Sequence, residues 1–141
     1  MKNLIFLFVF LFSIAVNFNL HAQLTGNKSI PGDYTTLSDA ITALNANGVG
    51  SGGVNFNIAG GYTETASNLV IAFTTNPASA SNPVIFQKSG GGANPLITAA
   101  PGSSPTLDGI IKLSGADYIT FDRIDLVDPV SNTGDAMMEW G

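Results

Sequence analysis

The feature that most constrains the fold of this chain is a series of short apolar runs, each four to six residues long, separated by Gly, Pro, Ser and Asn. Short runs bounded by turn-forming residues are typical of β-strands. The sequence therefore predicts an all-β chain. The runs are VNFNI (54–58), NLVIAF (68–73), PVIFQ (83–87), PLIT (95–98), GIIKLS (109–114), YITF (118–121) and IDLV (124–127), and AMMEW (136–140) begins another.

Alternation within these runs predicts which side chains point into the core. Successive side chains of a strand point to opposite faces of its sheet, so every second residue of a run shares one face. Each set is small enough to be the inward row of a single strand. The predicted inward rows are Val54, Phe56 and Ile58; Leu69, Ile71 and Phe73; Val84 and Phe86; and Ile119 and Phe121.

One segment, residues 34 to 48, has the pattern of a helix instead. Its apolar residues recur at spacings of three and four, which places them on one helical face. Thr36 and Asp39 have the spacing of a capping box, and Asn47 with Gly48 provides a stop. The sequence predicts an amphipathic helix that covers a core with Leu37, Ala40, Ile41 and Leu44.

Two architectures accommodate many short strands with Gly-rich turns: an antiparallel sandwich, and a solenoid whose coils stack on one another. An Asn-Gly or Asp-Gly pair linking two adjacent runs would indicate hairpins, and the sequence has none in that position. The runs at 118–121 and 124–127 are separated by two polar residues, as at a corner within one coil. The solenoid is therefore favoured, and the sandwich remains the alternative.

The N-terminus predicts export. Lys2 precedes an apolar run at residues 4–16, which two asparagines follow, and these are the n- and h-regions of a signal peptide. The run is too short for a membrane span, which needs roughly 20 apolar residues. We place cleavage after Ala22, so that 23–33 lead into the folded part. The mature chain is predicted to be secreted or held on the outer cell surface, with no membrane span.

Charge and missing residue types exclude several functions. The chain carries a net charge of −5 and its few Lys and Arg residues are scattered, so nucleic acid is not an expected partner. It has no cysteine, and its one histidine, His21, lies in the signal peptide. Histidine-dependent triads, His/Cys zinc sites and a histidine base are thereby excluded from the mature segment. No catalytic site is visible in it, and whether the protein is an enzyme stays open.

Four stretches resemble a known family: GDYTTLSDAITALNANGVGSGGVNFNIAGGYTET, NPVIFQKSGGGANPLIT, LSGADYITFDRIDLVD and NTGDAMMEWG. Together they are similar to the N-terminal region of bacterial surface or secreted proteins of the right-handed parallel β-helix (pectin-lyase-like) class, many of which carry a C-terminal type IX secretion sorting domain. The resemblance covers nearly all of residues 29 to 141. It implies a helix that caps the first coil, a link at GGYTET, and two strands around a bend in GADYITFDRIDL.

The resemblance also implies that residues 34–141 are the cap and first coils of such a β-helix. The chain stops at Gly141, within or just after a strand-like run, without a capping repeat, further coils or a sorting domain. A solenoid end without a cap exposes unpaired backbone groups. We therefore expect the sequence to be part of a longer protein.

The candidate binding residues are Asp122, Arg123, Asp125 and Asp128, with Asp117 nearby. Polysaccharide lyases of the resembled class use aspartates to hold calcium and an arginine as base. Alternation, however, puts these aspartates at bends or on outward faces, where carboxylates are solvated, and calcium needs six to eight converging oxygens. We predict no metal site and no cofactor. Calcium is the ion that a cluster of these aspartates would suit.

The function expected from the sequence is that of a secreted or cell-surface β-helix module, either structural and adhesive or binding an extracellular polysaccharide. Tyr34, Tyr62, Tyr118 and Trp140 could stack on sugar rings, although the strand positions of Tyr118 and Trp140 favour a place in the core or between stacked coils. The alternative is the N-terminal part of a polysaccharide lyase or glycoside hydrolase whose catalytic coils lie beyond residue 141.

Overall fold

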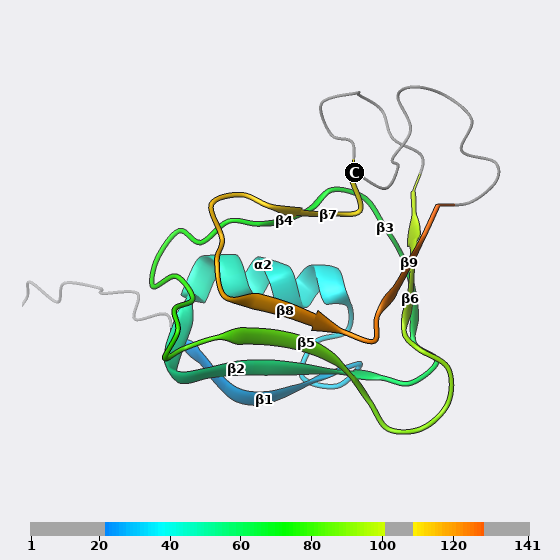
Figure 1. The fold of residues 1–141 in the computed structure, drawn as a ribbon, viewed down its shortest axis with the longest axis horizontal. Helices are drawn as coiled ribbons and strands as arrows, with labels where there is room; N and C mark the ends of the chain where they lie inside the picture. The colour runs from blue at the N-terminus through cyan, green and yellow to red at the C-terminus, as the bar shows by residue number, and fades with distance from the viewer. Residues whose placement is uncertain (1–21, 101–108, 129–141) are drawn as a thin grey trace, which may run out of the picture.

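A computed structural model describes residues 22–100 and 109–128 of the chain, which contain one helix and nine strands (Figure 1). In chain order these are β1 (Leu24–Ile30), α2 (Leu37–Asn47), β2 (Val49–Ala59), β3 (Thr63–Ala66), β4 (Leu69–Ile71), β5 (Val84–Ser89), β6 (Leu96–Ala99), β7 (Ile111–Leu113), β8 (Ile119–Asp122) and β9 (Asp125–Val127). The prediction of an all-β chain with one helix is confirmed for these residues.

The strands form three parallel sheets. The four-stranded sheet has the order β1–β2–β5–β8, the three-stranded sheet β3–β6–β9, and the two-stranded sheet β4–β7. All six strand pairs are parallel, and the antiparallel bridge between Ser79 and Asn82 lies outside the strands. The antiparallel sandwich is therefore wrong as an alternative. The finer assignment to a β-helix stays a prediction.

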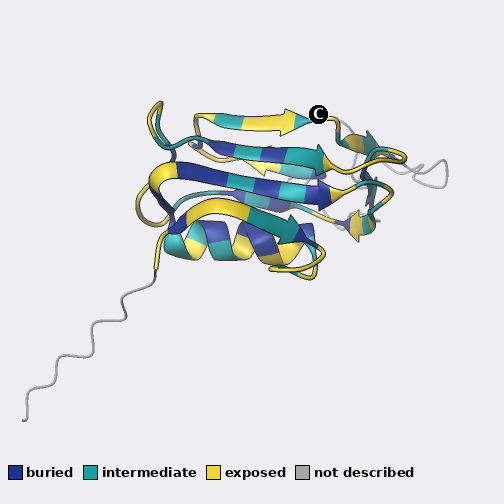
Figure 2. Ribbon diagram, turned by 90° about the horizontal axis from the view of Figure 1, so that it is seen from below, coloured by how far each residue is buried: buried dark blue, intermediate teal, exposed yellow. Residues whose placement is uncertain are grey.

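The three sheets lie along three sides of an open triangle when the molecule is viewed as in Figure 1. The chain visits them in turn, through β2, β3 and β4, then β5, β6 and β7, then β8 and β9. Seen from below, the four-stranded sheet runs from β1 at one end to β8 at the other, and α2 lies at the β1 end (Figure 2). The first two passages of the chain therefore supply one strand to each sheet, and β8 and β9 supply one strand each to two of the sheets.

The core lies between the sheets and the helix, and an aromatic stack runs through it. Parallel register aligns Phe56 with Phe86 and Phe86 with Phe121. The ring centroids of Phe56 and Phe86 are 4.7 Å apart, those of Phe86 and Phe121 5.2 Å, and Tyr34 packs on Phe56 at 5.9 Å. The predicted inward residues that the structure buries are Val54, Phe56, Ile58, Leu69, Ile71, Val84 and Phe86.

Three predicted core residues are less buried than expected. Ile119 and Phe73 are half-buried at the margin of the core, and Phe121 is 38% exposed. Phe73 follows the end of β4, so its side chain lies beyond the pairing with β7. Ile119 and Phe121 belong to β8, the last strand of its sheet among the described residues, so no further described strand covers them.

The predicted helix is confirmed, including both of its ends. Thr36 is the N-cap, its hydroxyl accepts a hydrogen bond from the Asp39 amide, and the Asp39 carboxylate accepts one from the Thr36 amide. Gly48 closes the C-terminus at a φ of 68°, in the left-handed region that favours glycine. The predicted apolar face is buried in full: Leu37, Ala40, Ile41 and Leu44.

Two strands were not predicted, and one is longer than predicted. Strand β1 lies within the expected lead-in at 23–33, and β3 covers the last three residues of GGYTET, which was expected to be a link, together with Ala66. Strand β2 begins at Val49 rather than at residue 54, because a bulge with positive φ at Gly52 and Gly53 lets the chain stay paired with β1. Mostly polar strands such as β1 and β3 give no alternating apolar signal from which to predict them.

Asn45 joins the helix to the two-stranded sheet. Its side-chain amide donates to the Val70 carbonyl at 2.8 Å and accepts from the Ala72 amide at 2.8 Å. The Thr74 amide and hydroxyl both donate to the Asn45 backbone carbonyl. The amide of Asn45 thus occupies the edge of β4 that faces away from β7, where a neighbouring strand would otherwise pair.

Replacing Asn45 by alanine is therefore expected to lower the free energy of unfolding by about 1 to 3 kcal/mol, because two backbone groups of a half-buried edge lose their partners. Urea unfolding followed by circular dichroism measures this. Ser38→Ala, on the exposed side of the same helix, is the matched control and should unfold at nearly the wild-type midpoint. Equal midpoints for the two variants would show that Asn45 does not hold the helix in place.

No helix among the described residues is long and apolar enough to cross a membrane. Apart from Ala22, the predicted signal peptide lies outside the described part of the chain. The strand predicted at 136–140, which includes Trp140, lies outside it as well.

Candidate functional site

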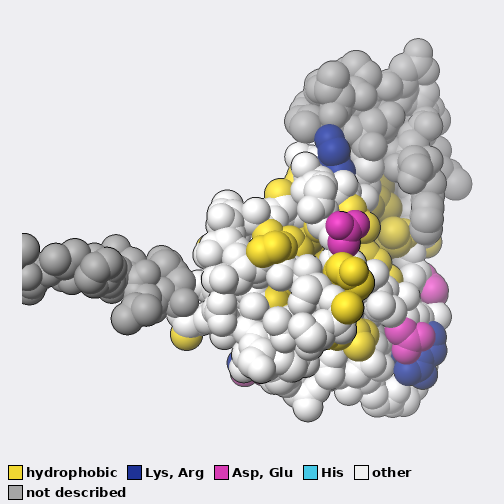
Figure 3. Space-filling view, turned by 60° about the vertical axis from the view of Figure 1, so that its left-hand side comes forward, with side chains coloured by type: hydrophobic (Ala, Val, Ile, Leu, Met, Phe, Trp, Pro, Cys, Tyr) yellow, Lys and Arg dark blue, Asp and Glu magenta, His cyan; other side chains and the backbone are white. Residues whose placement is uncertain are grey.

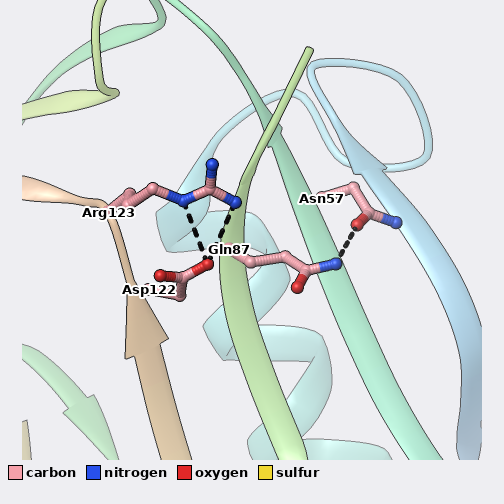
Figure 4. A network of polar contacts seen from close by, with 4 residues as sticks. All are labelled: Asn57, Gln87, Asp122 and Arg123. Carbon is pink, nitrogen blue, oxygen red and sulfur yellow. Dashed lines mark hydrogen bonds and ion pairs between the residues drawn. The ribbon is translucent and has the colours of Figure 1, made fainter.

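Two of the four candidate binding residues, Asp122 and Arg123, form an ion pair at the corner between β8 and β9 (Figure 4). Both Nε and one terminal nitrogen of Arg123 lie 3.1 Å from Oδ2 of Asp122. Arg123 has a φ of 56°, and this left-handed conformation turns the chain from one sheet into the next. The side chains are exposed, at 45% for Asp122 and 60% for Arg123. The guanidinium charge is therefore offset by a carboxylate at the surface.

The other two candidates are held elsewhere. Asp125 is the first residue of β9, in the three-stranded sheet, and its Oδ1 accepts a hydrogen bond from Asn94 Nδ2 at 3.0 Å. Asp128 follows the end of β9, and Asp117 precedes β8. Within residues 22–100 and 109–128, no three His, Cys, Asp or Glu side chains come together in a group that could hold a metal ion. The aspartates thus do not form the converging oxygen cluster that calcium requires.

A row of amide side chains lies on the outward face of the four-stranded sheet, and we call it the amide row: Asn27 in β1, Asn55 and Asn57 in β2, and Gln87 in β5. Asn27 Oδ1 accepts from Asn55 Nδ2 at 3.3 Å and from Asn57 Nδ2 at 3.4 Å. Gln87 Nε2 donates to Asn57 Oδ1 at 2.8 Å, as Figure 4 shows. Asn55 and Asn57 alternate with buried core residues and therefore face outward, and Asn27 and Gln87 lie on the same face because they bond to them.

Strand register extends the amide row to the ion pair. Asn57 is in register with Gln87, and Gln87 with Asp122. Because neighbouring strands are about 4.8 Å apart, these polar groups repeat at that spacing across the sheet. Ile85 and Thr120 form a second outward row beside them, in register with Asn55. The result is a polar surface with one half-buried apolar side chain in it.

The amide row is preorganised and retains hydrogen-bonding capacity. Each primary amide has two N–H donors and an acceptor oxygen with two lone pairs, and the bonds within the row use only part of these. The internal bonds fix the side-chain rotamers, which lowers the entropy that a ligand would otherwise have to remove. With Asp122 and Arg123 paired, the surface carries no net charge from these residues.

One aromatic side chain lies exposed beside this surface. Tyr118, expected in the core, is 55% exposed, which corrects that prediction. It precedes β8 at a φ of 56°, and its carbonyl accepts from the Val84 amide at the beginning of β5. The neighbouring Ile119 belongs to the inward row of this run, so alternation places the Tyr118 side chain on the outward side, in agreement with its exposure. Tyr34, by contrast, is half-buried against Phe56.

Two further polar contacts perturb pKa values. Burial raises the pKa of Tyr62, and the hydrogen bond from its hydroxyl to Glu64 Oε2, at 2.6 Å, raises it further. Hydrogen bonds from the Ser29 hydroxyl and amide, both at 2.7 Å, lower the pKa of Asp33. Tyr62 is thus a neutral donor to a carboxylate, and Asp33 closes the turn after β1. Both contacts stabilise the backbone and neither lies at the amide row.

The amide row was not predicted from the sequence. The signal was present, because Asn55 and Asn57 alternate with core residues in VNFNI, and Gln87 ends PVIFQ. Their grouping, however, depends on the register between strands that are 30 residues apart in the chain. Asn27 lies in β1, a strand that was not predicted.

Comparisons of this chain with protein-family models, with curated proteins and with solved structures find no match. The geometry of the described residues is therefore the basis for the functional argument.

Proposed function

We propose that this chain is an exported module with a right-handed parallel β-helix fold, which binds uncharged polysaccharide outside the cell through the amide row. The fold proposal is supported by the order in which the chain visits the sheets. Each strand pairs in parallel with the strand that follows one full round later, as β2 does with β5 and β5 with β8. Parallel crossovers of this kind are right-handed in nearly all proteins.

The observation that carries the functional proposal is the amide row itself. Polysaccharides present hydroxyl groups, which both donate and accept hydrogen bonds, and primary amides complement both roles. The polar groups of Asn57, Gln87 and Asp122 repeat at the strand spacing of about 4.8 Å. A linear glycan lying across the strands would meet one polar side chain at each strand. Ile85 and the exposed Tyr118 supply apolar surface for the faces of the sugar rings.

Charge favours an uncharged glycan over an acidic one. The chain has a net charge of −5, and the cation on this face, Arg123, is already paired with Asp122. An anionic polysaccharide would be repelled by the whole chain and would find no unpaired cation within the row. The paired charges still provide hydrogen-bond donors and acceptors to a neutral ligand.

Affinity electrophoresis of the chain without its signal peptide tests this proposal, with hydroxyethyl cellulose, xylan or galactomannan in the gel and polygalacturonate as the acidic probe. We expect at least one neutral polysaccharide to retard the protein and polygalacturonate not to. Replacing both Asn57 and Gln87 by alanine should weaken binding about thirtyfold, since two hydrogen bonds worth about 1 kcal/mol each are lost.

The matched control is the pair Thr65→Ala and Thr98→Ala, which removes polar side chains in register on the three-stranded sheet. This variant should be retarded like the wild type. Retardation by none of the neutral polysaccharides, or equal retardation of the amide variant and the wild type, would contradict the proposal.

A further inference from the structure

The outward side chains of the four-stranded sheet form two rows that run across its strands. The first, which we call the Gln87 row, consists of residues that strand register aligns: Asn57, Gln87 and Asp122. The second, which we call the Ile85 row, is aligned in the same way: Asn27, Asn55, Ile85 and Thr120. In Figure 2, seen from below, the four strands that carry these rows lie side by side.

The two rows define a strip with a fixed repeat and a fixed width. Along each row, side chains repeat at the strand spacing of about 4.8 Å. Between the rows, side chains two residues apart on one strand, such as Asn55 and Asn57, are separated by about 7 Å, which is twice the rise per residue of a strand. This width is comparable to that of a pyranose ring with its equatorial substituents. Hydrogen-bonding side chains thus line both margins of a strip that is one sugar wide.

We propose that the two rows bind one chain of neutral β-1,4-linked glucan, which lies flat across the strands with one hydroxyl edge over each row. This inference rests on the proposed glycan-binding function and adds the sugar, its linkage and its orientation. A β-1,4-linked glucan is an extended ribbon whose repeat per sugar is close to the strand spacing. Its equatorial hydroxyl groups point sideways along both edges. Successive sugars therefore meet successive strands, and each edge meets one row.

Ile85 favours glucose over a sugar with an axial hydroxyl group. Its half-buried side chain lies in register between Asn55 and Thr120, so the Ile85 row contains an apolar position. The faces of the rings in a β-1,4-linked glucan carry only C–H groups, because all the ring substituents are equatorial. Such a face packs on an apolar side chain and removes its surface from water. In mannan the axial hydroxyl at C2 projects from the ring face and interrupts this contact.

Both rows keep hydrogen-bonding groups for a ligand. In the Gln87 row, Gln87 Nε2 donates to Asn57 Oδ1, and Gln87 Oε1 accepts from no other described residue. In the Ile85 row, Asn27 uses its Oδ1 as the acceptor of two bonds, and its Nδ2 donates to no other described residue. One margin of the strip thus offers an acceptor and the other a donor. A hydroxyl group can complement either, because it both donates and accepts.

The charge distribution agrees with a neutral chain. Arg123, beside the Gln87 row, is paired with Asp122. On the side of the molecule that Figure 3 shows, the charged side chains are few and stand in small separate groups among uncharged ones. An acidic glycan of the same shape would therefore meet no continuous line of cations along the strip.

Titration of the 15N-labelled chain without its signal peptide, followed by NMR, tests the proposal with three hexasaccharides. We expect cellohexaose to shift the side-chain NH₂ signals of the amide row until they saturate. Xylohexaose lacks the hydroxymethyl group of every sugar and should bind at least about fivefold more weakly, the effect of losing one hydrogen bond. Maltohexaose contains the same sugars in α-1,4 linkage, which coils the chain, so it should not shift these signals.

Single variants of the two rows test whether both edges of the glucan are bound. Asn55→Ala in the Ile85 row and Gln87→Ala in the Gln87 row should each weaken the binding of cellohexaose about fivefold, as expected for one hydrogen bond. Thr98→Ala removes a polar side chain from the three-stranded sheet and should leave the affinity unchanged. The backbone signals of each variant establish that it is folded.

The outcomes separate this inference from the proposed function. Maltohexaose or xylohexaose binding as tightly as cellohexaose would overturn the inference, and so would a loss of affinity in only one of the two row variants. If any neutral polysaccharide retards the protein in a gel while cellohexaose does not bind, the assignment to β-1,4-linked glucan is wrong and the proposed function stands. If no neutral polysaccharide retards the protein, both are wrong.

Discussion

Replacing Phe86 by alanine is expected to lower the free energy of unfolding by about 3 to 5 kcal/mol, the usual cost of removing a fully buried phenyl ring. Phe86 is the central ring of the stack, between Phe56 at 4.7 Å and Phe121 at 5.2 Å, and it is completely buried. Its removal leaves Phe121 without its aromatic neighbour and leaves Phe56 with Tyr34 alone. A domain of this size is typically stable by about 5 to 15 kcal/mol, so the loss is a large part of the total.

Phe121→Ala removes the same side chain from the outer position of the same stack and is the matched control. Because Phe121 is 38% exposed and has one aromatic neighbour among the described residues, its loss should cost less than half as much. Urea unfolding of the two variants, followed by circular dichroism, gives the comparison. Equal losses would contradict the position of Phe86 at the centre of the core.

Replacing Glu64 by alanine is expected to cost about 2 to 3 kcal/mol, in the range measured for hydrogen bonds to a charged group. The Glu64 carboxylate, carried by β3, accepts from the Leu37 amide at 2.8 Å and from the Ser38 amide at 3.2 Å. These are first-turn amides of α2, which have no partner within the helix. The carboxylate also meets the positive end of the helix dipole. Without Glu64, the amide of the buried Leu37 loses its acceptor.

Two milder changes separate the contributions at Glu64. Glu64→Gln keeps one acceptor oxygen but removes the charge, so it should destabilise less than Glu64→Ala. Tyr62→Phe removes only the hydroxyl that donates to Oε2 and should cost about 1 kcal/mol. Thermal unfolding orders the three variants. A Glu64→Ala protein as stable as the wild type would show that the helix N-terminus does not depend on β3.

The sequence predicted those elements whose signal is local. The helix at 37–47 carries its own capping box, apolar face and glycine stop, and all three were found as predicted. Strands β5 and β6 begin within one residue of the predicted runs at 83–87 and 95–98. In such segments the alternation of apolar and polar residues is decided by burial, and it can be read without knowledge of the partner strand.

What depended on pairing between distant segments was not predicted. The contact of Glu64 with the helix joins residues 27 positions apart, and the amide row joins residues about as far apart. Alternation gives the face of each residue but not the register between strands, so it cannot group the outward amides. Tyr118 was misplaced because it lies within the apolar run YITF, where its neighbour Ile119 faces the core and Tyr118 does not.

The parallel register has a consequence for the order of folding. Each strand of the four-stranded sheet finds its partner one round earlier in the chain, so a strand cannot form its ladder until that round is in place. Forming non-local parallel pairs is slow compared with forming the local helix. We therefore expect the helix and the β1–β2 pair to form first and the later strands to add to them, in the direction in which the ribosome makes the chain.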